Sequence, residues 1–182
     1  ILGFAQLLER GARLPDPDRQ RQYARHVLNA GNYLLELIDQ VLELSKIEAG
    51  KLSLVCESVD LADVIAHSLF MVASRAKKAN VVIVNRTEGM ALPNLWADRG
   101  RVRQILLNFL SNAIKYNRKG GSVTVSAIPV DNDKIRITVE DTGTGIALHY
   151  QPQVFEPFNR LGREADGSEG SGIGLAITKQ IV

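Results

Sequence analysis

The chain has 182 residues, of which 45% are hydrophobic and 23% are charged, so it can bury a core and is not disordered as a whole. Its 22 basic and 20 acidic side chains leave a formal net charge of +2, which gives no electrostatic support for a dedicated nucleic-acid-binding protein. The single cysteine, Cys56, forms no internal disulfide, so we expect a reducing, cytoplasmic environment. No apolar run approaches the ~20 residues that span a bilayer, and we expect any membrane contact to come from segments outside this chain.

The first fifty residues predict a helical hairpin. A short amphipathic stretch comes first, and Pro15 interrupts it. Asp16 and Asp18 suit the start of a longer helix, which tolerates Pro17 in its first turn, and Gly50 suits its end. Because the chain begins inside the first amphipathic pattern and without Met, we expect that helix to be incomplete and the chain to be a piece of a longer protein.

The longer helix carries two adjacent rows of apolar residues. The first row repeats at alternating spacings of four and three, and the second follows it one residue later. Together they make a stripe too broad for a two-stranded coiled coil, and a four-helix bundle would bury it better. Since one hairpin supplies two helices, the pattern predicts a homodimer. The rows are Tyr23, Val27, Ala30, Leu34, Leu37, Val41 and Leu44, and then Leu28, Gly31, Leu35, Ile38 and Leu42.

After residue 50 the pattern becomes that of a domain with both helices and strands. Asp98 suits the N-cap of a helix that runs to about Tyr116, and Trp96 just before it is expected in the core. We expect the inner face of that helix to hold Ile105, Leu106, Phe109, Leu110 and Ile114. The other expected elements are a helix over 61–80, a short buried strand over 81–85, a β-hairpin over 123–139, a long loop over 142–170 and a helix over 172–182.

Four segments carry unusual residue choices, and the first lies on the helix that follows Asp98. Asn108, Asn112 and Lys115 are spaced i, i+4 and i+7, so they share one helical face. Carboxamide oxygens suit a hard cation, and a lysine beside them suits phosphate oxygens. A solvated polar face on an otherwise buried helix is the alternative.

The second segment runs from Asp141 to Ile146, directly after an expected strand. Gly143 and Gly145 permit close backbone approach to a ligand, and an Asp at a strand end can accept a hydrogen bond from an amine. A dinucleotide-binding turn is excluded, because Leu148 stands at the third glycine position and Pro152 would end the crossover helix. An ordinary turn remains the alternative.

The third segment is Gly170-Ser-Gly172-Ile-Gly174-Leu175, at the entry to a helix. Free N–H groups there, with glycines that let an anion approach, predict a phosphate site. A flexible hinge is the alternative.

The fourth segment places Phe155 and Phe158 in a polar loop just before Arg160. A hydrophobic anchor that pins the loop explains the two aromatic rings.

In this order the four segments resemble the N, G1, F and G2 boxes of sensor histidine kinases. The hairpin resembles their dimerisation and phosphotransfer domain, and Leu44 to Lys51 resembles the exit from that domain. The resemblance implies an α+β fold, with a hairpin that forms a dimeric four-helix bundle and then an α/β sandwich with a mixed sheet, the Bergerat ATP-binding fold. It divides the chain into a hairpin over 1–50, a linker over 51–58 and an ATP-binding domain over 59–182 whose last strands would be missing.

The resemblance also implies a site for ATP and Mg²⁺. Asn112 would bind Mg²⁺, with Asn108 near the metal and phosphates and Lys115 on a phosphate. Tyr116 would border the adenine, and Asp141 would receive the adenine amine. The other implied contacts are Gly143, Gly145 and Ile146 around the base, Phe155 and Phe158 as lid anchors, Arg160 at the terminal phosphate, and Gly170, Gly172, Gly174 and Leu175 over the phosphates.

By the same resemblance, the reaction is phosphoryl transfer from Mg·ATP to a histidine, then to an aspartate of a response-regulator receiver domain that docks on the lower part of the hairpin. The family's acceptor lies in a His-Glu-x-x-x-Pro box just before the stretch that begins here with Ile1, and His26, His67 and His149 do not replace it. We therefore expect the catalytic histidine upstream of Ile1, and we expect this chain to bind ATP but not to autophosphorylate. Related ATPases carry a glutamate base where Asn108 stands, and a carboxamide takes no proton, which favours a kinase.

Two other functions are consistent with part of the sequence. A nucleotide-responsive dimeric scaffold, or pseudokinase, would act through protein contacts, and the residue at the upstream acceptor position would distinguish it from an enzyme. A coiled-coil adaptor with an inert globular tail is disfavoured by the four ordered motifs.

Overall fold

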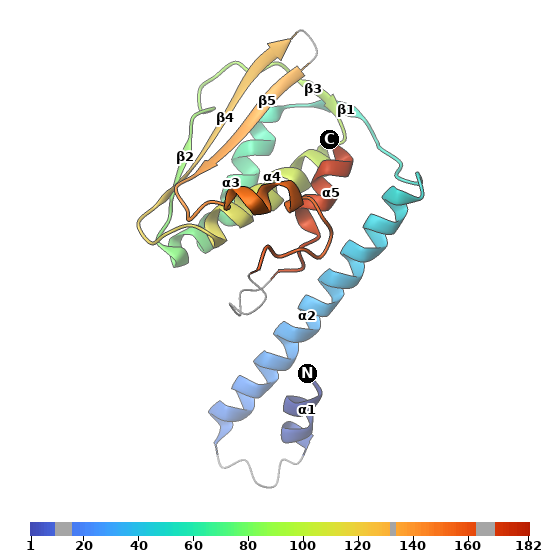
Figure 1. Cartoon of the computed structure of the whole chain (residues 1–182). Helices are drawn as coiled ribbons and strands as arrows, with labels where there is room; N and C mark the ends of the chain where they lie inside the picture. The colour runs from blue at the N-terminus through green and yellow to red at the C-terminus, as the bar shows by residue number, and fades with distance from the viewer. Residues whose placement is uncertain (10–15, 132–133, 163–169) are drawn as a thin grey trace. The chain divides into compact units, whose positions relative to one another are not determined.

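The computed structural model describes residues 1–9, 16–131, 134–162 and 170–182, which form two compact units over 1–51 and 52–182 (Figure 1). The first unit is a pair of helices, and the second combines helices with two small sheets. Within the described ranges, no helix has the length and apolar character needed to cross a membrane.

The first unit holds α1 (Leu2–Glu9) and α2 (Pro17–Glu48). Asp16 is extended and its side chain accepts a hydrogen bond from the backbone N–H of Asp18 at 2.9 Å, so it caps α2. Gly50 adopts a φ of 64°, and its N–H closes the last turn on the carbonyl of Ile47 at 2.9 Å. The expected start and end of the long helix are therefore confirmed.

Helix α1 begins immediately after the first residue of the chain. The carbonyl of Ile1 accepts the N–H of Ala5 at 3.0 Å, which closes the first turn, and the Ile1 side chain is 47% exposed. Helix α1 therefore has 8 residues, against 32 in α2.

Aromatic rings of α1 and α2 are in contact. The Phe4 ring stacks on His26 with 4.9 Å between ring centroids, and it lies 5.4 Å from the ring of Tyr23. These contacts leave most of the broad apolar stripe of α2 uncovered in a single copy. The exposed large side chains are Leu28, Leu34, Leu35, Ile38, Val41 and Leu42.

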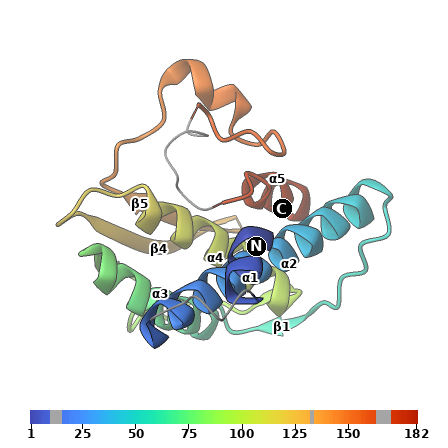
Figure 2. The same cartoon turned by 90° about the horizontal axis from the view of Figure 1, so that it is seen from below.

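The second unit contains a three-stranded sheet in the order β2-β4-β5, in which β2 is parallel and β5 antiparallel to β4, and a separate antiparallel pair β1-β3. Helices α3 and α4 cover one face of the larger sheet, and α5 lies along α4 (Figures 1 and 2). The expected mixed sheet with covering helices is therefore confirmed. The elements are β1 (Glu57–Val59), α3 (Leu61–Ala79), β2 (Val82–Asn85), β3 (Leu95–Ala97), α4 (Arg99–Lys115), β4 (Ser122–Asp131), β5 (Lys134–Asp141), the 3₁₀ helix η2 (Leu148–Gln153) and α5 (Gly174–Ile181).

The unit is held together by apolar residues from α3, α4 and β4. Along β4 every second side chain points to the helices, so Val123, Val125 and Ala127 are buried while the residues between them are not. Leu106 and Leu110 on α4 are each 1% exposed, and truncating such a leucine to alanine costs roughly 2–5 kcal/mol. Burial of this stripe of α4 sets the direction in which the rest of the helix faces.

Three expected core positions are wrong. Val82 is 59% exposed because alternate side chains of β2 point away from the core, against which Ile83 packs, so the strand is only half-buried. Trp96 is 74% exposed because Leu95 and Ala97 face inward on β3, which turns the residue between them outward. Phe109 is exposed on the flank of α4, whose buried stripe runs through Val102, Leu106, Leu110 and Ala113.

The unit's boundary also differs from the expected one. The division between the units falls after Lys51, and Glu57 and Ser58, expected in a linker, pair with β3 as part of β1.

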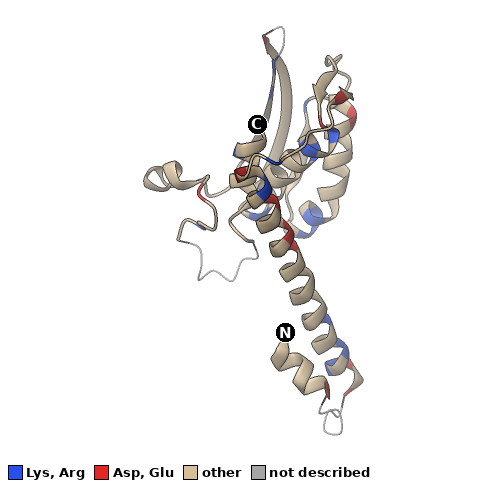
Figure 3. Cartoon of the chain, turned by 90° about the vertical axis from the view of Figure 1, so that its right-hand side faces the viewer, with Lys and Arg blue, Asp and Glu red and all other residues tan. Residues whose placement is uncertain are grey.

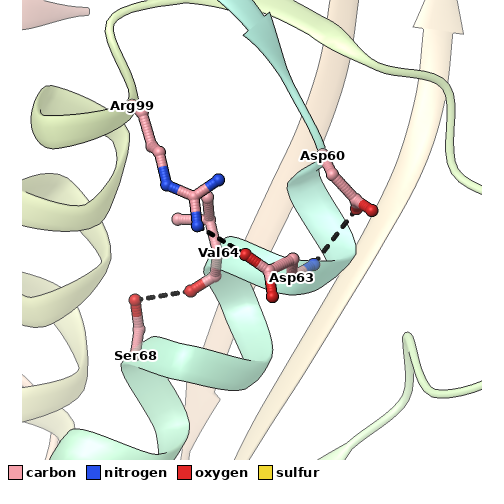
Figure 4. Close-up of polar contacts among 5 residues, drawn as sticks. All are labelled: Asp60, Asp63, Val64, Ser68 and Arg99. Atoms are coloured by element: carbon pink, nitrogen blue, oxygen red, sulfur yellow. Dashed lines mark hydrogen bonds and ion pairs between the residues drawn. The ribbon is translucent and has the colours of Figure 1, made fainter.

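Capping and an ion pair join the starts of α3 and α4 (Figure 4). Asp60 caps α3 by accepting the N–H of Asp63 at 3.1 Å, and the Asp63 carboxylate pairs with the guanidinium of Arg99, the first residue of α4, at 2.5 Å. One turn further along, the buried Ser68 hydroxyl donates to the carbonyl of Val64 at 2.7 Å. Both helices therefore start from one polar cluster at the edge of the core.

Asp98 performs two tasks at the start of α4. Its Oδ1 accepts the N–H of Arg101 at 3.1 Å and caps the helix, and its Oδ2 accepts the N–H of Val55 at 3.1 Å. The N–H groups of Val55 and Arg101 hold the pKa of the Asp98 carboxyl below its ordinary value. The carboxylate therefore ties the segment before β1 to the start of α4.

We predict that Asp98→Ala lowers the free energy of unfolding by about 1–2 kcal/mol at pH 7, because a cap and a second hydrogen bond are lost together. A lowered folded pKa stabilises the fold above the unfolded pKa of about 3.9, and this contribution disappears as the pH falls through the folded value. Urea unfolding measures the free energy of unfolding of wild type and of Asp98→Ala at pH 7 and near pH 3. The difference between the two proteins should be smaller near pH 3 than at pH 7. Glu88→Ala, at an exposed turn, is the control, and a pH-independent difference would contradict the assignment.

Candidate functional site

The polar face of α4 is the centre of the candidate site. Asn108, Asn112 and Lys115 lie on it, each half-buried, because the opposite stripe of the helix is in the core. Among the described residues the Asn112 side chain makes no hydrogen bond, so its carboxamide oxygen is available to a ligand. The first sequence motif thus presents ligand groups on a rigid helix.

Asn108 connects this face to the third motif. Its Nδ2 donates to the carbonyl of Gly174 at 3.0 Å and to the hydroxyl of Thr178 at 3.1 Å, and that hydroxyl donates in turn to the Gly174 carbonyl at 3.0 Å. A Cβ at Gly174 would lie 3.3 Å from Asn108 Oδ1, so the two helices touch closely here. The start of α5 is therefore held against the middle of α4.

Lys115 brings a cation to the glycine-rich segment. A Cβ at Gly170 would lie 2.8 Å from Lys115 Nζ, and Gly170 adopts a φ of 147°. The same amine donates to the Tyr116 hydroxyl at 2.8 Å and sits 4.5 Å from the centroid of the Tyr116 ring. An anion bound at the start of α5 would therefore meet this amine.

The second motif packs against the end of α4. The N–H of Thr144 donates to the carbonyl of Tyr116 at 3.3 Å, and a Cβ at Gly143 would lie only 2.4 Å from that oxygen. Asp141 Oδ1 accepts the N–H of Gly143 at 2.8 Å, and within the described residues its Oδ2 accepts no hydrogen bond. One oxygen of an exposed carboxylate is therefore fixed and the other is free for an amine.

The loop with the two phenylalanines is attached through its backbone. The Phe158 N–H donates to the carbonyl of Gly172 at 3.1 Å, and a Cβ at Gly172, whose φ is 73°, would lie 2.9 Å from the carbonyl carbon of Phe158. The rings of Phe155 and Phe158 are 40% and 59% exposed, and the Lys179 amine lies 5.3 Å from the Phe155 centroid. The segment with η2 projects from the rest of the unit (Figures 2 and 3).

The structure therefore joins the motifs unequally. The first motif contacts both the second and the third, and the fourth contacts the third. Gly145 and Ile146 lie in the exposed part of the loop, where Ile146 accepts a hydrogen bond from Gln151 at 3.2 Å, and Arg160 and Leu175 are half-buried. Residues 163–169, part of the expected loop, lie outside the described residues.

The phosphoacceptor position that the sequence resemblance places upstream of Ile1 also lies outside the described residues. Ile1 itself is an apolar residue at the start of the hairpin and carries no group that could accept a phosphoryl group. The expected acceptor histidine therefore stays a prediction about the parent protein.

Sequence reasoning missed three residues that the structure places at the motif junctions, namely Asn117, Thr142 and Thr178. Thr178 lies one helical turn after Gly174, so helical spacing could have indicated it. Asn117 and Thr142 are 25 positions apart but hydrogen-bonded to each other, and no spacing rule indicates that they meet.

The donor set fits a magnesium-bound nucleotide. A free carboxamide oxygen on Asn112 suits a hard cation, the Lys115 amine and glycine-rich backbone suit phosphates, and the free Asp141 oxygen suits an exocyclic amine.

Comparisons with known proteins agree with this arrangement. A family model described as histidine kinase-, DNA gyrase B- and HSP90-like ATPase matches residues 97–182, and the His Kinase A (phospho-acceptor) domain matches residues 1–50. The cell-division control histidine kinase PdhS of Brucella canis is 35% identical over 192 residues, covering 100% of this chain and 18% of PdhS.

Two solved structures are also similar. Full-length ShkA in complex with AMPPNP has a TM-score of 0.77 and 32% identity, covering 100% of this chain and 36% of ShkA. A mycobacterial sensor histidine kinase, MprB, has a TM-score of 0.57 and 32% identity, covering 70% of this chain and 78% of the solved MprB chain.

Fold and site together define an ATP-binding domain of the histidine kinase, gyrase B and HSP90 type, preceded by a helical hairpin of the phospho-acceptor type. The chain belongs to the sensor histidine kinase family. It spans 18% of the length of PdhS.

We predict that Gly143→Ala weakens binding of an ATP analogue by about tenfold or more, because the added methyl must displace the Tyr116 carbonyl and misplace Asp141. Calorimetric titration with AMPPNP and Mg²⁺ measures the change. Gly3→Ala, whose Cβ would meet nothing within 4 Å, should bind as wild type does. Unchanged affinity in Gly143→Ala would show that the close approach at residue 143 is not needed for binding.

Proposed function

We propose that this chain is the dimerisation and ATP-binding core of a sensor histidine kinase, whose parent protein transfers the γ-phosphoryl group of Mg·ATP to a histidine and then to a response-regulator aspartate. The observation that carries this proposal is the convergence on α4. Asn108 and Lys115 meet the glycine-rich entry to α5, and Tyr116 meets the loop of Asp141.

Each part of the site has a distinct task in this proposal. Bound Mg·ATP supplies the transferable phosphoryl group and the charge-neutralising cation. Asn112 offers its carboxamide oxygen to Mg²⁺, and Lys115 neutralises phosphate charge. Asp141 accepts the adenine amine with its free oxygen, and Tyr116 borders the base. Gly143, Gly145 and Ile146 surround the base, Phe158 and Arg160 belong to the lid, and Gly170, Gly172, Gly174 and Leu175 cover the phosphates.

Asn108 favours transfer to a protein group over hydrolysis. Its Nδ2 donates to Gly174 and Thr178, and a carboxamide takes no proton from water at neutral pH. A general base for water is therefore absent at this position, so the γ-phosphoryl group is retained for a nucleophile that enters the site in line.

The three histidines of this chain are not proposed as that nucleophile. His26 stacks on Phe4 in the hairpin and His67 is exposed on α3. His149 lies within η2, where its ring centroid is 4.1 Å from that of Tyr150. The acceptor is proposed to lie upstream of Ile1 in the parent protein. The scaffold alternative is not favoured, because the related proteins are histidine kinases.

We predict that the chain binds AMPPNP more tightly with Mg²⁺ than without it, and that Asn112→Ala removes at least about tenfold of the affinity measured with Mg²⁺, because a metal ligand is lost. Calorimetric titrations with and without Mg²⁺ make the comparison. Gln180→Ala removes an exposed carboxamide from α5 and should leave binding unchanged. Absence of binding by the folded wild-type chain would overturn the proposed ATP site.

The hairpin is proposed to complete its core with a second copy. One copy leaves the apolar stripe of α2 exposed, including Leu35, Ile38 and Leu42, and a second hairpin supplies the two further helices of a four-helix bundle.

The receiver domain is proposed to dock on the lower part of the hairpin, near α1 and the first half of α2. Basic residues gather at that end of α2, and acidic residues follow toward its other end (Figure 3).

We predict that Leu35→Glu raises the dissociation constant of the dimer by at least about 100-fold, because a charge would enter an apolar interface. Light scattering after size-exclusion chromatography over a concentration series measures it. Asn32→Glu places the same charge outside both apolar rows and should leave the dimer intact. A dimer of unchanged affinity in Leu35→Glu would contradict a bundle built on this stripe.

A further inference from the structure

Asn117, Ser122 and Thr142 form a hydrogen-bonded cluster at the start of the second motif, which we call the interlock. The Thr142 hydroxyl donates to Asn117 Oδ1 at 3.1 Å and accepts the N–H of Ser122 at 2.9 Å. Asn117 Nδ2 donates to the carbonyl of Ser122 at 2.9 Å, and the N–H of Thr142 donates to that same carbonyl at 3.1 Å. Three segments are joined at this point: the residues that follow α4, the start of β4 and the end of β5.

The packing around the interlock leaves little room for adjustment. A Cβ at Gly121 would lie 2.2 Å from Asn117 Oδ1 and 2.5 Å from Thr142 Oγ1, so only glycine fits beside the pair. Asn117, Ser122 and Thr142 are all half-buried, which limits competition from water for these hydrogen bonds. Both side chains have their polar atoms hydrogen-bonded, and the Ser122 carbonyl at 3.5 Å is a second, longer acceptor for the Thr142 hydroxyl.

The interlock is joined through the backbone to Tyr116 and to Asp141, the two residues proposed to contact the base. Asn117 directly follows Tyr116, whose carbonyl accepts the N–H of Thr144, and Thr142 directly follows Asp141. A displacement of Thr142 would therefore move both the Asp141 carboxylate and the turn that fixes its Oδ1. The phosphate end of the site depends on other contacts, namely those of Asn108 with Gly174 and Thr178.

We propose that Asn117 and Thr142 are positioning residues that set the distance and direction of the Asp141 carboxylate and thereby its selectivity for adenine over guanine nucleotides. This inference rests on the proposed ATP site. An amine of adenine is a donor to Asp141, whereas guanine presents a carbonyl oxygen at the equivalent ring position, so a well-placed carboxylate accepts the first and repels the second. Breaking the hydrogen bonds of the interlock should therefore reduce the preference for adenine over guanine nucleotides and leave the phosphate contacts unchanged.

The test uses the whole chain and compares Mg·AMPPNP with Mg·GMPPNP. Thr142→Val replaces the hydroxyl by a methyl group, and Asn117→Ala removes the opposite partner. Each is expected to reduce the ratio of adenine to guanine affinity by about tenfold, with the guanine affinity nearly constant. Thr142→Ser keeps the hydroxyl and should retain the ratio. Thr138→Val makes the same exchange at an exposed position on β5 and is the matched control.

A double-mutant cycle joins the two positions. If the two side chains act as one unit, the double variant should lose little more selectivity than either single variant. An equal loss of affinity for both nucleotides, or an unchanged ratio in folded Thr142→Val, would overturn the proposal, because a merely structural role predicts no change in base preference.

A measurement without nucleotide separates this inference from the ATP site. Hydrogen exchange at the amides of Gly143 and Thr144 should accelerate at least about tenfold in Thr142→Val, while exchange at the buried amides of α4 stays near wild type. Acceleration in a chain whose wild type binds no nucleotide would refute the ATP site and the selectivity role with it, and leave a structural brace. Unchanged exchange with intact wild-type binding would refute the interlock alone.

Discussion

Burial of one stripe of α4 determines how the second unit is arranged. Leu106, Leu110 and Ile114 are fixed between α3 and the sheet, and the helix has no freedom to turn about its axis without exposing them. Its opposite face then presents Asn108, Asn112 and Lys115 in one direction. Every contact with the glycine-rich motifs starts from that face or from the residues that follow it, so the apolar core sets the geometry of the polar site.

The two units differ in how far they cover their own apolar residues. The second unit covers its own core with helices packed on a sheet, whereas the hairpin has only two helices, one of them short, and leaves a broad apolar stripe uncovered. The proposed dimeric bundle would cover that stripe with the helices of a second copy. In the second unit the motifs are joined to one another by hydrogen bonds within the chain.

Local chemistry predicted the elements well and their exposure less well. Asp16, Asp98 and Gly50 mark helix ends because capping depends on a few neighbouring atoms. Trp96 and Val82 were misplaced because hydrophobicity alone does not tell which face of a strand is covered. Among the site residues, the ligand-bearing types were visible as motifs. Thr142 lies inside the second motif but has no assigned task there, Asn117 lies just after the first motif, and the two become linked only when β5 returns beside β4.

The order of the four motifs and the amphipathic periods can be read from the linear chain, and they are sufficient to indicate the family. The folded chain is needed to see that the Asn108 amide holds α5, that the Lys115 amine reaches Gly170 and that Thr142 bonds to Asn117. These contacts join residues 25 to 70 positions apart, and their distances follow from how helices and strands pack against one core. The packing of the apolar core therefore decides which polar groups lie close enough to form hydrogen bonds.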